Sequence, residues 1–345
     1  MREWPRLGAA LAGLATIVAA AFPARAQSVA DFYRGKTLTI VLGLDPGGTY
    51  DASARMVARS IGKYIPGNPN VVIQYMSGVN AVPAANYVYN IAPHDGSTIW
   101  GGARLAPFEP LFGNANARFD AAKVRWLGST ASETGVVIAW RDAPVQTTDD
   151  LFTKELIVGA TIPGGDTYLY PNALNKLLGT KFKMVSGYSS QEPIGLAMEK
   201  GEVQGSGNWS WSGIPVFHAD WLADKKIHVL MQLGLRKHPD LPDTPLVMDY
   251  AKTPEQTQIL SVLMGMKQFG YPFFSPPGVP EDRAAAIEKA FGDLFHDADF
   301  LAEAKRQNRS AGMATGAEMT KVVAAAYALP DDVVAKARDV ISAAK

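Results

Sequence analysis

The chain has 345 residues, with 33 Lys and Arg, 33 Asp and Glu, five His and no Cys, and its formal net charge is +0. This length allows two domains with a hydrophobic core each. The lack of Cys excludes thiol nucleophiles, disulfides, iron–sulfur clusters and zinc sites built on Cys. The balanced charge disfavours nucleic-acid binding, and the hydrophobic content of 47% is that of an ordinary globular protein.

The N-terminal residues have the pattern of a secretory signal peptide. Arg2 and Arg6 precede the apolar stretch Leu7–Phe22, and Ala24-Arg25-Ala26 supplies the small residues expected at a cleavage site. The apolar stretch is shorter than the about 20 residues that span a bilayer, so we interpret it as a leader and not as a membrane anchor. We therefore predict a signal peptide over residues 1–26 and a mature chain that is exported to the periplasm.

Beyond this leader, segments with strand and helix patterns alternate. β-Branched and apolar residues predict strands over Thr37–Gly43 and Asn70–Met76, and apolar residues at helical spacing predict a helix over residues 51–64 between them. Further strands are expected at residues 97–100, 125–130, 135–140, 155–160, 181–186 and 226–233, and further helices at residues 83–90, 193–200 and in the tail from residue 280. This alternation predicts an α/β fold with parallel sheets covered by helices.

Two loops of similar sequence follow predicted strands. Pro46-Gly47-Gly48 comes after the first strand, and Pro163-Gly164-Gly165 comes after the strand near residues 156–159. In open α/β sheets, ligands bind at the carboxyl ends of the strands, and a helix N-terminus there presents N–H groups to an anion. The same glycines also suit simple tight turns, so the residues alone leave both interpretations open.

Sequence signatures of catalysis are incomplete or missing. Gly43–Gly48 has the spacing of a phosphate-binding loop, but Thr49 replaces the required Lys and Tyr50 replaces the required Ser or Thr. No G-x-G-x-x-G opens a helix after the first strand, and there is no nucleophile elbow or H-E-x-x-H pattern. The histidines are scattered without a shared helical face. We therefore predict no catalytic residue, no metal site and no cofactor.

Five short motifs occur in a specific order along the predicted mature chain. They are Pro46-Gly47-Gly48-Thr49-Tyr50-Asp51, Ala92-Pro93-His94-Asp95-Gly96-Ser97-Thr98, Gly201-Glu202-Val203, Leu241-Pro242-Asp243-Thr244-Pro245 and Pro276-Pro277-Gly278-Val279-Pro280. This series resembles the motifs of the tripartite tricarboxylate transporter receptors, the TctC or Bug type of periplasmic solute-binding protein. The resemblance implies two α/β lobes, each a mostly parallel sheet flanked by helices, with a ligand, usually a carboxylate, in the cleft between them. It also implies a membrane transporter as partner.

The resemblance implies ligand-binding residues in loops of both lobes. In the first lobe these are Gly47, Gly48, Thr49 and Tyr50, with Asp51 as a helix cap, and Ser77, Gly78 and Asn80 in a second loop, where only Gly78 matches the usual glycines of the family. In the second lobe they are Gly164, Gly165, Asp166 and Thr167, with Tyr188 and Trp209 near the cleft.

Several of these residues have a second interpretation. Asp166 repels a carboxylate, so it either meets an ammonium or hydroxyl group of the ligand or caps the helix that follows. Trp209 either lines the cleft or packs in a core, and Tyr188 either closes the pocket or belongs to a turn. Arg104, outside the family motifs, either pairs with a distal carboxylate or is solvated.

The resemblance also predicts the extent of each lobe. We expect the first lobe to comprise residues 27–140 plus 265–345 and the second lobe to comprise residues 141–264. The crossings between them are expected at Ala143-Pro144 and near residues 265–270.

The function that we expect from the sequence is binding without chemistry. A monomeric receptor would capture a small organic carboxylate by closing its lobes and deliver it to the subunits of a membrane transporter. Two alternatives use the same cleft. One is a periplasmic hydrolase or transferase with Ser186, His218 and Asp166 as a polar triad, and the other is a ligand-sensing subunit of a membrane kinase.

Overall fold

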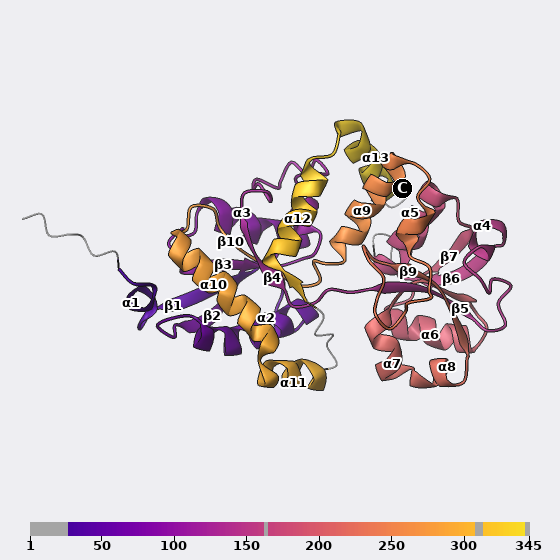
Figure 1. Ribbon diagram of the computed structural model, residues 1–345, viewed down its shortest axis with the longest axis horizontal. Coiled ribbons are helices and arrows are strands. Elements are labelled where there is room, and N and C mark those ends of the chain that lie inside the picture. Colours follow the sequence, from indigo (N-terminus) through magenta and orange to yellow (C-terminus); the bar gives the residue numbers. More distant parts are fainter. Residues whose placement is uncertain (1–26, 162–164, 308–312, 342–345) are drawn as a thin grey trace, which may run out of the picture.

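The computed structural model describes residues 27–161, 165–307 and 313–341 and contains two β-sheets, each flanked by helices. The sheets lie side by side in Figure 1, and each forms the centre of one lobe. This arrangement confirms the predicted two-lobed α/β fold. The predicted signal peptide lies outside the described residues.

The sheet of the first lobe has the strand order β11-β4-β10-β3-β1-β2. Its strands are β1 (Thr37–Leu42), β2 (Asn70–Tyr75), β3 (Thr98–Gly101), β4 (Arg125–Ser129), β10 (Pro272–Ser275) and β11 (Ala314–Thr315). β1 lies between β2 and β3 and is parallel to both. It buries Leu38, Ile40, Val41 and Leu42, whose apolar side chains cover both faces of a central strand.

The sheet of the second lobe has the strand order β7-β6-β8-β5-β9. Its strands are β5 (Gly135–Trp140), β6 (Leu156–Ala160), β7 (Phe182–Ser186), β8 (Gly205–Ser210) and β9 (Ile227–Leu233). Parallel pairs occur in both sheets, as predicted, but each sheet also contains antiparallel pairs and is therefore mixed. The reason is that β10 and β5, which follow the crossings between the lobes, run antiparallel to both of their neighbours.

Helices cover both faces of each sheet. Those around the first sheet are α1 (Val29–Tyr33), α2 (Thr49–Ser60), α3 (Val82–Asn90), α10 (Glu281–Asp293), α11 (Ala298–Arg306) and α12 (Gly316–Tyr327). Those around the second are α4 (Asp150–Thr153), α5 (Asp166–Leu178), α6 (Gln191–Glu199), α7 (Ile214–Phe217) and α8 (Ala219–Ala223). Two more, α9 (Pro254–Met266) and α13 (Asp331–Ile341), lie between the lobes on the upper side of Figure 1.

The largest hydrophobic core extends through both lobes. It contains Val41 and Trp100 of the first sheet, Val137 and Val158 of the second, and buried residues of α9 such as Leu263 between them. Two smaller cores lie on the opposite faces, one under α2 and α10 and the other under α6 and α8. The lobes are therefore joined by packed side chains as well as by the chain itself.

Two extended segments cross between the lobes and are hydrogen-bonded to each other. Thr130 N donates to Tyr271 O at 3.2 Å, Gly270 N to Ala131 O at 3.0 Å, and Glu133 N to Lys267 O at 3.1 Å. A Cβ atom at position 270 would lie 2.6 Å from Ala131 O, so the close approach of the two segments needs a glycine there.

The position of these crossings corrects two expectations. β5 belongs to the second sheet, although the predicted boundary at residue 140 assigns it to the first lobe, and the chain crosses at residues 130–134 and not at Ala143-Pro144. α13 packs against α9 and against α5 of the second lobe, where Lys176 Nζ donates to Asp339 O at 2.7 Å. The C-terminal helix therefore does not belong to the first lobe alone.

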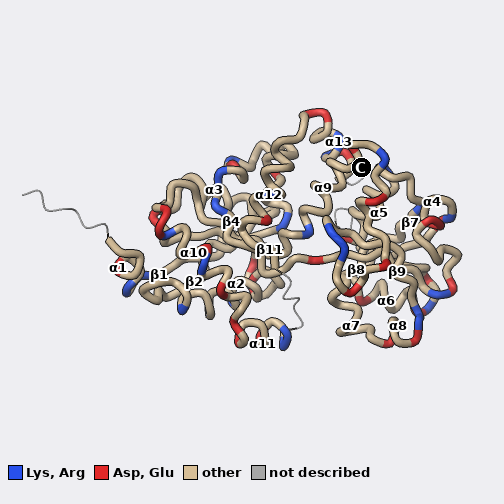
Figure 2. Tube along the Cα trace, in the orientation of Figure 1, with Lys and Arg blue, Asp and Glu red and all other residues tan. Residues whose placement is uncertain are grey.

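Charged residues of both signs are interspersed over both lobes in the described part of the chain (Figure 2). Among the described helices, none combines the length and the hydropathy that crossing a membrane requires.

Candidate functional site

Two cavities lie at the junction of the lobes. The first has a volume of about 850 Å³ and is lined by residues of both lobes, including Thr49, Arg104, Asn208, Trp209 and Lys267. The second, of about 390 Å³, is lined by Tyr50, Asn80, Leu105, Tyr170 and Met266 among others. The first volume lies within the range of about 300–1,000 Å³ that is usual for small-molecule sites.

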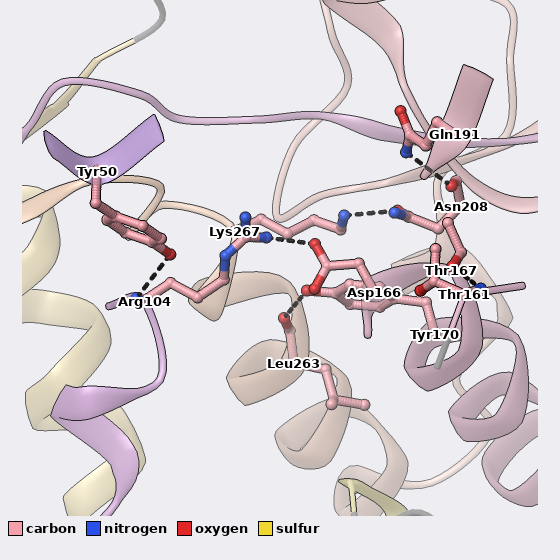
Figure 3. Close-up of polar contacts among 10 residues, drawn as sticks. All are labelled: Tyr50, Arg104, Thr161, Asp166, Thr167, Tyr170, Gln191, Asn208, Leu263 and Lys267. Atoms are coloured by element: carbon pink, nitrogen blue, oxygen red, sulfur yellow. Dashed lines mark hydrogen bonds and ion pairs between the residues drawn. The ribbon is translucent and has the colours of Figure 1, made fainter. Parts of the chain in front are cut away.

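Arg104 and Asp166 line both cavities and form an ion pair between the lobes (Figure 3). Arg104 follows β3 of the first lobe, and Asp166 is the first residue of α5 in the second. The negative charge of Asp166 raises the pKa of the Arg104 guanidinium above its already high ordinary value. Asp166 does not cap α5, because the N-cap residue is Gly165 and no side-chain cap bond is present. The structure thus adds a role for Asp166 that the sequence did not suggest, as the partner of a cation from the other lobe.

Lys267 is the most deeply buried cation of the site. It follows α9, and its side chain is only 2% exposed. Its Nζ atom donates to Asn208 Oδ1 on β8 at 2.7 Å and lies 3.9 Å from the ring centroid of Tyr170 on α5. Both contacts favour an ammonium group, the first as a hydrogen bond and the second as a cation–π interaction.

The surroundings of Lys267 disfavour its charge. Burial lowers the pKa of the Lys267 ammonium from 10.5 to about 8; the negative charges of Asp166 and Glu133 oppose this shift and the positive charge of Arg104 adds to it. Glu133 lies on the first crossing segment and accepts a hydrogen bond from Ser212 Oγ at 3.2 Å.

The first-lobe loop over Gly47–Tyr50 is divided between solvent and the two cavities. Gly47 and Gly48 are exposed and line neither cavity, whereas Thr49 lines the first and Tyr50 the second. Tyr50 packs edge-on against Tyr271, with ring centroids 4.9 Å apart, and its hydroxyl accepts a hydrogen bond from Arg104 N at 3.4 Å.

Asp51 accepts hydrogen bonds from the loop, from α2 and from the end of β2. Its carboxylate accepts hydrogen bonds from Gly47 N at 2.7 Å, from Tyr75 Oη at 2.6 Å and from Arg55 Nε at 3.0 Å. The residue is 3% exposed. Burial opposes the charge, but the hydrogen bonds from Tyr75, Gly47 and Arg55 outweigh it and lower the pKa of Asp51. Gly48 is the N-cap of α2, so Asp51 does not cap as expected but binds back to the loop from the first turn of the helix. One N–H group of the predicted anion loop is therefore already bonded to a carboxylate.

The second loop of the first lobe has a special backbone conformation. Asn80 has φ 51°, and its amide donates to the carboxylate of Glu109. Asn80 lines the second cavity, while Ser77 is exposed and Gly78 N donates to Gly43 O at 3.2 Å.

The predicted residues of the second lobe have different surroundings. Gly164 lies outside the described residues. Thr167 is buried, and its hydroxyl accepts a hydrogen bond from Thr161 N at 2.9 Å, which fixes the start of α5 to the end of β6. Tyr188 is half-buried against the core under α6 and does not line the first cavity.

Trp209 both packs in a hydrophobic core and lines the first cavity, so the two alternatives given for it are compatible. It is 1% exposed and packs against Trp221, with ring centroids 5.3 Å apart, yet it also lines the first cavity. The triad of the hydrolase alternative is not assembled: His218 contacts Glu192 at 3.1 Å, Asp166 pairs with Arg104, and no hydrogen bond among the described residues joins either of them to Ser186.

The comparisons with known proteins identify the fold. No protein-family model and no curated protein sequence matches the chain. A TctC solute-binding protein from Polaromonas aligns over 90% of this chain and 99% of its own, with a TM-score of 0.68 at 15% identity. MatC from Rhodopseudomonas palustris with bound malate has a TM-score of 0.52 at 17% identity, over 89% of this chain and 99% of its own. Another R. palustris protein, with adipate, has a TM-score of 0.55 at 17% identity, over 88% of this chain and 97% of its own.

The fold is therefore that of the two-lobed periplasmic solute-binding proteins. Within that class the structural neighbours are of the TctC and Bug type, which confirms at the level of the fold the resemblance found in the sequence motifs. These neighbours are binding and transport proteins and not enzymes.

Proposed function

We propose that this protein is a periplasmic receptor that captures a small organic carboxylate between its lobes and delivers it to a tripartite tricarboxylate-type membrane transporter. The fold supports this proposal, and so do the malate and adipate held by two neighbours of that fold.

The observation that carries the proposal is the first cavity. It is large enough for a small diacid, and both lobes contribute to its walls, so a ligand in it contacts both. Arg104, Lys267 and Lys305 bring positive charge to its walls, Glu133, Asp166 and Glu192 bring negative charge, and Asn208 brings an amide. Hydrogen bonds to a charged group contribute about 1.5–3 kcal/mol each, so three or four approach the ~8 kcal/mol of a micromolar complex before ordering costs.

Closure of the lobes around the ligand would couple binding to delivery. A ligand that contacts both lobes favours the state in which they are close together. The closed state presents a surface composed of both lobes, which a membrane subunit can distinguish from the open state.

Isothermal titration calorimetry with mono-, di- and tricarboxylates tests the proposal. We expect at least one acid, with malate and adipate included in the panel, to bind with a micromolar Kd, and its dimethyl ester or amide to give no heat. If none of these acids gave a heat of binding, the result would argue against a carboxylate receptor. Export is tested separately by mass spectrometry of the periplasmic fraction, where we expect a mature chain that starts at Gln27.

A further inference from the structure

Lys267 is a buried cation without a carboxylate partner. Among the described residues, no Asp or Glu forms an ion pair with it, although burial of an unpaired charge is costly. The two acids whose charges act on it are engaged elsewhere, Asp166 with Arg104 and Glu133 with Ser212. The protein therefore maintains a buried ammonium group that no carboxylate among the described residues contacts directly.

The ammonium also has donor capacity left. It carries three N–H groups, of which Asn208 Oδ1 accepts one, while the ring of Tyr170 covers another side. Lys267 and Asn208 both line the first cavity, and Figure 3 shows the Lys267 side chain extending past the Arg104–Asp166 pair to Asn208.

Gly135 leaves room beside this pair. It is the first residue of β5 and also lines the first cavity. A Cβ atom there would lie 2.7 Å from Lys267 Nζ and 2.2 Å from Asn208 Oδ1. The absence of a side chain at position 135 thus allows the Lys267–Asn208 pair to form at the cavity wall.

We propose that Lys267 and Asn208 form the anion subsite of the first cavity and bind a carboxylate group of the ligand. This inference rests on the proposed function and assigns the charged end of its ligand to a side-chain ammonium. The glycine loop of the first lobe is the less suitable place, because Gly47 N already donates to Asp51 and neither Gly47 nor Gly48 lines a cavity.

Binding at Lys267 would be linked to protonation. The groups that face Lys267 are Asp166 and Tyr170 of α5, Arg104 after β3, Glu133 of the crossing segment and Asn208 of β8. With the pKa of Lys267 near 8 in the empty site, a carboxylate binds the protonated form and raises that pKa. The association constant for an ionised diacid should then fall about tenfold between pH 7 and pH 9 at constant ionic strength.

The test compares Lys267→Met with Lys200→Met by calorimetry, with malate, adipate and any further acid that the unmodified protein binds as probes. Lys200 is an exposed residue at the end of α6, outside the cavities. We expect the first variant to lose at least tenfold in affinity and the second to match the unmodified protein.

Unchanged affinity in Lys267→Met would overturn this inference and leave the proposed function standing. Absence of binding by the unmodified protein would instead contradict the proposed function, and the inference with it. If Lys267→Met fails to fold, the pH dependence of the unmodified protein decides: a tenfold fall supports the subsite, and a constant affinity between pH 7 and pH 9 overturns it.

Discussion

Arg104 Nη1 and Asp166 Oδ2 form an ion pair between the lobes, and both residues line both cavities. Both side chains are about one-third exposed, at 32% and 35%. An ion pair of this exposure contributes modestly to the stability of the fold. Because it joins the two lobes, however, its energy favours the state in which they are in contact.

Removal of this pair is expected to favour separation of the lobes. Asp166→Asn should lower the ratio of closed to open ligand-free protein by about fivefold, equivalent to about 1 kcal/mol. Because the chain has no Cys, nitroxide labels can be attached specifically at Ile91→Cys in the first lobe and Leu196→Cys in the second. Double electron–electron resonance then measures the distance between the two labels.

The matched control is the exchange of the two charges. The double variant Arg104→Asp with Asp166→Arg should restore the distance distribution toward that of the unmodified protein. A distribution that is identical in all three proteins would show that the pair does not hold the lobes.

Lys267 should destabilise the ligand-free protein at neutral pH. Its pKa falls from 10.5 to about 8 on folding, so between these values the unfolded chain binds more protons than the folded one. Stability attributable to this residue therefore rises with pH through this window, by about 3 kcal/mol in total, and is lost as the pH falls through about 8. Urea unfolding at pH 7–10.5 measures the free energy of unfolding of the unmodified protein and of Lys267→Met. As the pH rises, the free energy of unfolding of the unmodified protein should increase relative to that of the variant. A difference that is independent of pH would mean that the ammonium is not destabilised by burial.

Asp51 should stabilise the first lobe through its charge. Asp51→Asn weakens the bonds from Gly47, Tyr75 and Arg55 in a site that is 3% exposed, and we expect a loss of about 2–4 kcal/mol in the free energy of unfolding at pH 7. Because folding lowers the pKa of Asp51, this contribution is complete above the unfolded value of about 4 and is lost as the pH falls through the lower folded value. The free energies of unfolding of the unmodified protein and of Asp51→Asn, measured by denaturation at several pH values, should therefore approach each other in acid.

Asp31→Asn is the matched control for Asp51→Asn. Asp31 is exposed and pairs with Arg34 one helical turn away, so its replacement should leave the denaturation midpoint unchanged. An equal effect of both substitutions would attribute the loss to general surface charge and not to the Asp51 contacts.

Gly135→Ala should damage the site without changing any charge. The new methyl group would overlap Asn208 Oδ1 and Lys267 Nζ, so we expect a loss of about 1–3 kcal/mol in stability and of ligand affinity. Gly292→Ala is the control, since apart from the adjacent backbone of α10 no described heavy atom lies within 4 Å of its Cβ position, and it should stabilise the protein by about 0.5–1 kcal/mol. Thermal unfolding and calorimetry on both variants separate these effects.

The alternation of strands and helices was accessible from the sequence because it depends on local patterns. The strands around Ile40 and Ile73 are rich in β-branched residues, and the observed β1 and β2 end one residue before the predicted limits. β10 has only four residues and begins with Pro272, so no alternating pattern marks it. The direction of β5 and β10 follows from where the chain crosses between the lobes, which is a tertiary property.

The site was predicted less well than the fold because its contacts join distant residues. Arg104 and Asp166 are 62 positions apart and come from different lobes, and Lys267 and Asn208 are 59 apart. A signal was present at Lys267, the one charged residue in the apolar run from Ile259 to Tyr271. A Lys in such a run is expected to be buried, but only the fold shows that Asn208 and Tyr170 meet it.

The hydrophobic core shared by both lobes affects how the molecule can move and melt. Opening the lobes widely would expose apolar side chains of α9 and α13 to water, so we expect the lobes to move by a pivot about these helices that keeps their packing. Such a pivot would change the width of the first cavity, whose lining includes residues of α7 and α11. These two helices lie on the lower side of Figure 1, opposite α9 and α13. Unfolding of either lobe also removes part of the other lobe's interior. Heat should therefore melt the two lobes as one cooperative unit, with a single calorimetric peak, although two sheets are present.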